Sequence, residues 1–397
     1  MAGRRPIATI GIVVAVVTFV MAGVDRAGAH SGLRHTLRRA PELIGVGSIA
    51  NERYENAVDA LLETGVRNLP VHTTGGAAYT YRYDPGCNCY TAVPLVAGPW
   101  FLIDRAEPVG PGLTTVSLTF AEYNLTDAFG CTFGEDKKQV RISAGSINYR
   151  AGTELLYTVG TLGIIHGITD DLEVSAAIPF AAIDFGVNPT ASGGTAGGFA
   201  RASEHFHVGP NIMDMLVRLK YRVWSGGPLT ASVGGRSRIP TGNPADGLGT
   251  GYGELGPFFL LSGSFGDGVL GTYLDTGFDA DVSDGRRSSG RYGLGLTLQA
   301  PFGTWWHNVV LTGEVLGRSE VAGIRHASSV SGPHRGGTCP YLCLDPSRQD
   351  YFDATLGLRV RVVRSLVLSI GVFKPINEDD GVRASGFSPV GSIEATF

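Results

Sequence analysis

Basic side chains recur at every second position in two apolar stretches of the chain. Arg218, Lys220 and Arg222 follow one another in this way, and Arg236 and Arg238 repeat the spacing. In an extended strand alternate side chains point to the same face, so these five groups would share one surface. A basic surface of this kind facing water attracts anions and repels cations. The first chemistry that the sequence indicates is therefore an electrostatic bias on solutes.

Acidic and basic residues elsewhere fit the same inward-facing pattern. We predict that the strands enclose a central space, the lumen of a barrel, and that charged side chains line it. These are Glu173, Arg218, Lys220, Arg222, Arg236, Arg238, Asp275, Asp279, Asp353, Arg359, Arg361 and Glu394. The alternative is that the basic residues form an internal salt-bridge network with Asp214, Asp275 and Asp279 that merely fills this lumen. The sequence leaves both interpretations open.

Few residues point to catalysis or metal binding. The nucleophile motif Gly-x-Ser-x-Gly is absent from the sequence. His205 and His207 beside Glu204 form a His-x-His pair, and His326 and His334 lie near two cysteines, but histidines in such loops are more often merely solvated than bound to a metal. We therefore predict that the protein is not an enzyme and has no metal and no cofactor.

The cysteines lie in stretches that contain Gly, Pro and Asp, as loops do. Export would place them in an oxidising compartment, which favours disulfides that stabilise loops. A redox motif or a metal site is the alternative for the Cys-Pro-Tyr-Leu-Cys stretch, but zinc would need two further ligands. The candidates are Cys87, Cys89, Cys131, Cys339 and Cys343; at least one of these five stays unpaired within the chain.

From residue 114 onward, runs of about ten residues alternate in polarity and are separated by turn residues. Transmembrane β-barrel strands have this pattern, because alternate side chains face lipid and lumen. We predict an all-β fold, an antiparallel transmembrane barrel of about twelve strands. The expected strands are 114–124, 154–166, 172–180, 213–223, 229–239, 254–264, 269–282, 291–299, 308–318, 351–363, 366–374 and 386–397.

The connections between these strands alternate in length, as in bacterial barrels with periplasmic turns and external loops. The expected turns are 168–171, 225–227, 265–268, 302–304 and 364–365. The expected external loops are 125–151, 183–207, 240–252, 283–290, 319–350 and 376–385. An aromatic girdle at the periplasmic rim would consist of Trp224, Phe302, Trp305 and Trp306.

A soluble β-sandwich would also show alternation, but its interior would be apolar rather than charged. The barrel predicts the effect of two substitutions on neighbouring positions. Leu358→Arg places a charge in lipid and should cost about 2 to 4 kcal/mol, whereas Arg359→Leu should leave folding nearly intact.

Composition and the amino terminus agree with an exported membrane barrel. Only 17% of residues are charged, the net charge is -4, and Gly occurs 58 times, so nucleic acid is an unexpected partner. Apart from residues 7–24 no run is apolar enough for a transmembrane helix. That run follows Arg4 and Arg5 and precedes Ala27-Gly28-Ala29, a signal-peptidase pattern. An uncleaved anchor is the alternative.

Several segments resemble outer-membrane transporters. The last residues, VGSIEATF at 390–397, are similar to a carboxy-terminal barrel strand ending in an aromatic residue. GITDDLEVSAAIPF at 167–180 resembles a strand-turn-strand signature of a transporter family associated with the meta-pathway of phenol degradation and related to long-chain fatty-acid transporters. Residues 75–85 and 98–107 resemble a leader found before the first strand in some members, from which Cys87 and Cys89 depart.

The resemblance implies a barrel whose assembly signal includes Phe397 and which takes up hydrophobic or aromatic compounds. We expect a signal peptide at 1–29, an amino-terminal periplasmic or plug-like segment at 30–112 and a transmembrane barrel at 113–397. The expected function is passive passage of small hydrophobic, aromatic or anionic solutes across the bacterial outer membrane. The alternatives are a structural or adhesive surface barrel and an outer-membrane hydrolase. Expected partners are outer-membrane lipids, the barrel-assembly machinery and a small-molecule solute, and the sequence leaves the oligomeric state open.

Overall fold

The computed structural model describes most of the carboxy-terminal 300 residues and parts of the amino-terminal region. The described residues are 33–39, 42, 62–63, 65–67, 69–70, 79–84, 89–94, 98–125, 139–144, 147–193, 199–266, 268–283, 288–299, 309–321, 350–363, 365–377 and 386–397. The expected signal peptide lies outside them. So do the cysteines apart from Cys89, the girdle residues Phe302, Trp305 and Trp306, and the pair His326 and His334.

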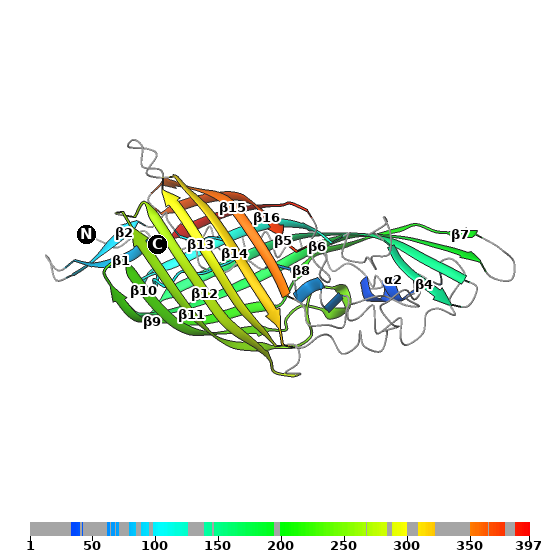
Figure 1. The fold of residues 1–397 in the computed structure, drawn as a ribbon, viewed down its shortest axis with the longest axis horizontal. Coiled ribbons are helices and arrows are strands. Elements are labelled where there is room, and N and C mark those ends of the chain that lie inside the picture. Colours follow the sequence, from blue (N-terminus) through cyan, green and yellow to red (C-terminus); the bar gives the residue numbers. More distant parts are fainter. Residues whose placement is uncertain are drawn as a thin grey trace.

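The described strands form a closed antiparallel barrel of twelve strands, as predicted (Figure 1). The barrel closes where the last strand pairs with the first, from Val390 opposite Ala121 to Thr396 opposite Thr115. The twelve strands are β3 (Thr114–Asn124), β5 (Ile147–Gly167), β6 (Leu172–Gly193), β9 (Met215–Gly226), β10 (Leu229–Ile239), β11 (Glu254–Phe265), β12 (Leu270–Asp281), β13 (Ser289–Gln299), β14 (Val309–Glu320), β15 (Asp350–Val363), β16 (Leu366–Pro375) and β17 (Ser388–Thr396).

Two of the expected loops, 125–151 and 183–207, are wrong in part because they contain strands. β5 and β6 stay paired as far as Ile147 opposite Gly193, well beyond the predicted ends. These extensions carry β4 (Gln139–Ala144), β7 (Phe199–Arg201) and β8 (Glu204–Ile212). They project beyond the rest of the barrel (Figure 1). A hairpin outside the bilayer has no lipid on either face, so backbone pairing holds it without the alternation that marks the other strands.

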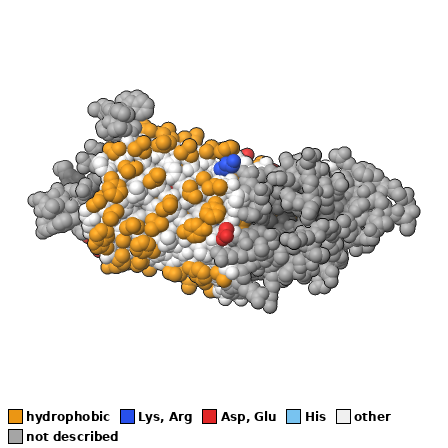
Figure 2. Space-filling model, in the orientation of Figure 1, with side chains coloured by type: hydrophobic (Ala, Val, Ile, Leu, Met, Phe, Trp, Pro, Cys, Tyr) orange, Lys and Arg blue, Asp and Glu red, His pale blue; other side chains and the backbone are white. Residues whose placement is uncertain are grey.

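The outer face of the barrel is apolar. Leu219, Tyr221 and Val223 on β9 are each half exposed, and Leu294, Leu356 and Ile370 are more exposed still. Hydrophobic side chains cover the described barrel surface in Figure 2, and charged ones appear there only near one edge. Exposed apolar side chains of this size on ten of the twelve strands would be costly in water, whereas lipid accommodates them. The protein is a transmembrane barrel of the bacterial outer membrane.

Short and long connections lie at opposite ends of the barrel. At the turn end, short connections join β5 to β6, β9 to β10, β11 to β12 and β15 to β16. Gly227 has a φ of 56°, a left-handed conformation that makes so short a turn possible. At the loop end a longer connection holds the short helix η4 (Pro244–Asp246). In bacterial barrels the turn end faces the periplasm.

The remaining described elements belong to the amino-terminal region. Helix α2 (Leu33–Arg39) lies against η4 at the loop end. The hairpin of β1 (Tyr79–Asp84) and β2 (Cys89–Pro94) lies at the turn end, near the carboxy terminus (Figure 1). In the described part of the chain no helix is long and apolar enough to cross a membrane.

Candidate functional site in the barrel interior

A stretch of irregular chain crosses the interior of the barrel. We call residues 98–110 the lumenal segment; they precede β3 directly and form neither helix nor strand. Trp100, Phe101, Leu102 and Ile103 are at most 2% exposed. The sequence singled out part of this stretch only by resemblance, and left open whether the amino-terminal region lies in the periplasm or in the lumen.

The strongest anchor of the lumenal segment is a single carboxylate on β14. Glu314 accepts hydrogen bonds from the backbone N–H groups of Trp100 at 2.5 Å, Leu102 at 2.5 Å and Phe101 at 3.2 Å. Three consecutive N–H groups aimed at one anion form a concave anion-binding backbone. Hydrogen bonds to an ionised carboxylate are stronger than ordinary amide bonds.

Further polar contacts hold the lumenal segment to strands around the wall. Arg359 on β15 donates to the carbonyl of Gly98 at 2.8 Å, and Lys220 on β9 donates to the carbonyl of Arg105 at 3.2 Å. Ser232 on β10 donates to the carbonyl of Ala106 at 2.6 Å, and the N–H of Ala106 donates to Ser262 on β11 at 2.7 Å. The N–H of Val109 reaches Glu173 on β6 at 2.7 Å.

Glycines in the wall make room for two apolar side chains of the lumenal segment, those of Trp100 and Ile103. A Cβ at Gly357 on β15 would lie 2.7 Å from Nε1 of Trp100. A Cβ at Gly295 on β13 would lie 2.3 Å from Cδ1 of Ile103. Both distances are shorter than a van der Waals contact, so no larger residue fits at either position without moving the segment.

Each of the five basic residues predicted on adjoining strands is paired with a carboxylate. The pairs are Arg218 with Asp104 at 2.7 Å, Lys220 with Glu173 at 2.9 Å, Arg222 with Asp171 at 2.6 Å, Arg236 with Asp279, and Arg238 with Glu254 at 3.1 Å. Of the carboxylates expected in such a network only Asp279 takes part. Asp275 pairs with Arg291, and Asp214 instead accepts from the backbone of Gly242 and Thr250.

The other predicted lining residues lie on β15 and β17. Arg359 and Glu394 are fully buried and form a two-pronged pair at 3.0 and 3.1 Å. This pair undercuts the expectation that Arg359→Leu is harmless, because the substitution would leave Glu394 buried without its cation. Asp353 borders a cavity near the loop end, and Arg361 is partly buried nearer the turn end. That the predicted set lines a conducting path stays a prediction.

The interior has an apolar sector and a charged sector. Strands β16, β17, β3, β5 and β6, which are neighbours in the sheet, contribute apolar side chains at the loop half. These include Ala121, Tyr123, Leu155, Tyr157, Val159, Ala181, Ile183, Phe185, Phe373 and Val390. Strands β9 to β15 contribute the arginines and most of the carboxylates described above, whereas Glu173 comes from β6 and Glu394 from β17. The lumenal segment lies between the sectors, with Phe101 packed edge-on against Phe373.

Amino-terminal residues also cover the interior at the loop end. We call residues 65–67 and 69–70 the cap residues; Val66 and Leu69 are buried in the same apolar cluster as Trp100. Arg67 contacts Glu254 at 3.2 Å and Glu320 at 3.6 Å. Burial alone would lower the pKa of the Arg67 guanidinium, but Tyr252 and these carboxylates raise it above its ordinary value.

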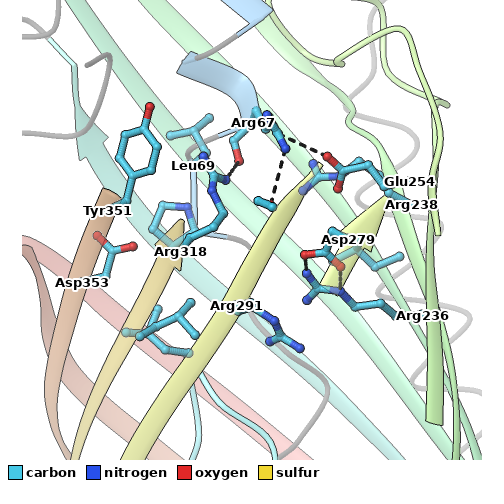
Figure 3. A pocket seen from close by; sticks show the side chains of 15 residues that line it. Arg67, Leu69, Arg236, Arg238, Glu254, Asp279, Arg291, Arg318, Tyr351 and Asp353 are labelled. Carbon is cyan, nitrogen blue, oxygen red and sulfur yellow. Dashed lines mark hydrogen bonds and ion pairs between the residues drawn. The ribbon is translucent and has the colours of Figure 1, made fainter. Parts of the chain in front are cut away.

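Between the cap residues and the lumenal segment lies a cavity of about 110 Å³, which we call the chamber. Leu69 and Pro70 border it on one side and Leu102 on the other, and strands β9 to β15 supply the rest of its wall. Figure 3 shows charged side chains arranged around its centre.

Sequence reasoning missed several of these groups. Glu314 and Arg291 fit the inward alternation of their strands, as Thr312 and Thr297 do, so closer use of the same signal would have found them. Asp104 and Arg67 belong to stretches without any period, and no sequence signal marks their partners.

The histidine pair does not form a metal site with its described neighbours. His207 contacts Asp184 at 2.6 Å, with both side chains exposed. No group of three or more His, Cys, Asp or Glu residues within the described ranges is arranged to hold a metal ion. Disulfide formation stays a prediction.

No protein-family model and no curated protein match the chain. The family resemblance inferred from sequence therefore stays a prediction. Among solved structures the chain is similar to the COG4313 outer membrane channel from Pseudomonas putida F1, with 13% identity, a TM-score of 0.43, and coverage of 74% of this chain and 98% of the other. It is also similar to the NanC porin, with 11% identity, a TM-score of 0.38 and coverage of 71% and 98%.

A third similar structure is a FadL homologue from Pseudomonas aeruginosa, with 10% identity, a TM-score of 0.36 and coverage of 83% and 99%. The assignment of this chain to the outer membrane stands on its own strand pairing, its apolar outer face and its charged interior.

Proposed function

We propose that the protein is an outer-membrane channel for small hydrophobic, aromatic or anionic solutes, closed at rest by its lumenal segment. The observation that carries the proposal is the arrangement of the interior. An apolar sector and a charged sector lie on either side of the lumenal segment. A solute with an apolar body and an anionic group finds complementary surfaces on the two sides. A lumen kept only for stability would be better filled by apolar side chains than by paired charges.

Opening requires the lumenal segment to leave part of the wall. The segment has no regular backbone pairing of its own. Its polar contacts are discrete hydrogen bonds, such as those to Glu314, Arg359 and Lys220, and the ion pair of Asp104 with Arg218, while its apolar side chains pack in the interior. A stretch held in this way can move without breaking the barrel, because the strands keep all their ladder bonds. Passage is then passive, down the concentration gradient of the solute.

The test is conductance and solute uptake in liposomes with a variant that loosens the lumenal segment. Trp100→Ala removes the largest side chain inside the barrel, which is 0% exposed. Such truncations cost about 3 to 5 kcal/mol in a packed core, and here the loss falls on docking of the segment. We expect higher conductance and faster uptake than in the wild type.

Trp224→Ala is the matched control, because Trp224 is half exposed on the outer face. Its conductance should equal that of the wild type. The proposal fails if Trp100→Ala and the wild type are equally impermeable to ions, aromatic acids and neutral aromatic solutes while both migrate as folded barrels. Deleting the whole amino-terminal region is a poorer test, since that region supplies much of the interior packing.

A further inference from the structure

The chamber is lined by an unusual concentration of arginine. Five guanidinium groups reach it from the cap residues and from three strands. They are Arg67, Arg236, Arg238, Arg291 and Arg318, and Figure 3 shows them distributed around the chamber. The lining holds three carboxylates, Glu254, Asp279 and Asp353. Cations therefore outnumber anions in the lining itself, and the carboxylates of Asp275 and Glu320, which pair with Arg291 and Arg67, lie outside it.

The ion pairs of the wall do not use all the donors of Arg236 and Arg291. Arg236 contacts Asp279 through Nε and Nη2, and Arg291 contacts Asp275 through its two terminal nitrogens. A guanidinium carries five N–H donors in a planar fork. Nε of Arg291 is buried and has no hydrogen-bond partner within the described ranges. A buried donor without a partner carries an energetic penalty that a bound anion would relieve.

The rest of the lining is apolar and limits the size of a ligand. Leu69, Pro70, Leu102, Leu216 and Leu316 face the same space as the arginines. The chamber volume of about 110 Å³ is somewhat smaller than the roughly 150 Å³ that accepts a benzene molecule in an apolar cavity. Planar carboxylates match the guanidinium fork, and a monoanion costs less to bury than a dianion.

We propose that the chamber is a binding site for a small monocarboxylate, with its carboxylate on Arg291 and Arg236 and a short apolar body against the leucines. This inference rests on the proposed channel function, in which the chamber holds the solute between the cap residues and the lumenal segment. Capture there would make the pathway selective for organic acids over neutral molecules of the same shape.

Calorimetric titration of the full-length protein in detergent tests this proposal. The probe is butyrate, compared with butyramide, which has the same shape but no charge, and with inorganic phosphate, which has charge but no apolar body. We expect butyrate to bind at least tenfold more tightly than either, since hydrogen bonds to a charged group are the stronger ones. Arg291→Gln should weaken butyrate binding tenfold or more.

Arg39→Gln is the matched control, because Arg39 forms an exposed pair with Glu42 away from the chamber. It should bind butyrate as the wild type does. Leu216→Trp is a second variant that fills the chamber without touching an ion pair, and it should abolish binding even if Arg291→Gln does not fold.

Equal affinity for butyrate and butyramide, tighter binding of phosphate, or no binding of butyrate to the folded wild type would overturn the proposal. Conductance reports separately on the proposed function. A protein that conducts but does not bind butyrate refutes only the chamber, and one that binds butyrate but never conducts refutes the channel.

Discussion

Replacing Glu314 by Gln should release the lumenal segment while leaving the barrel intact. The carboxylate accepts from three consecutive N–H groups, those of Trp100, Phe101 and Leu102. An amide keeps one acceptor oxygen and turns a donor toward one of these N–H groups. Charge-assisted bonds contribute about 1.5 to 3 kcal/mol and neutral ones about 0.5 to 1.5 kcal/mol. The three weakened bonds therefore lower the docking free energy by about 3 kcal/mol.

A change of about 3 kcal/mol corresponds to roughly a hundredfold shift in the equilibrium between docked and released segment. Single-channel recording in planar bilayers measures this shift as the fraction of time that the channel is open. Glu122→Gln is the matched control, because Glu122 is exposed on the outer face of β3. If Glu314→Gln forms a heat-modifiable barrel and its open fraction equals that of the wild type, the segment is not the closing element.

Three further substitutions test the faces of the wall. Leu358→Arg should destabilise the barrel by about 2 to 4 kcal/mol through a charge in lipid, measured by urea titration in lipid vesicles; an unchanged midpoint would place Leu358 away from the bilayer. Arg359→Leu should cost about 3 to 5 kcal/mol in the same titration because Glu394 loses its partner, and tolerance would mean that the pair is dispensable. Gly357→Leu should displace Trp100 and raise conductance, whereas conductance equal to that of the wild type would show that the wall can yield there.

The sequence was sufficient to predict the barrel because a membrane imposes different solvents on the two faces of every strand. On β15 the apolar side chains of Leu356 and Leu358 face outward and Arg359 faces inward. This difference between the lipid-facing and lumen-facing side chains is visible within each strand. The sequence of a single strand therefore indicates which of its side chains face outward. All twelve predicted strands overlap strands of the fold.

The parts that could not be predicted are those where this contrast is missing. The far ends of β5 and β6 have no lipid on either side, so their pairing does not require a sequence that alternates in polarity. The lumenal segment depends on contacts with residues 60 to more than 200 positions away, such as Glu173 and Glu314. Its apolar run from Trp100 to Ile103 indicates burial. The hydrogen-bond partners of its irregular backbone, however, can be identified only once the strands of the barrel wall are in place.

The position of the lumenal segment also constrains the order in which the chain assembles. The segment precedes β3, the strand on which β17 closes the barrel. Its anchors come from strands as distant in the chain as β6, β9, β14 and β15. Once β17 has paired with β3, the wall is a continuous ring, and the side chains of Trp100 and Ile103 would have to enter past its rim. The pairing of β17 with β3 and the burial of the lumenal segment are thus coupled steps, and the barrel closes with this segment already inside it.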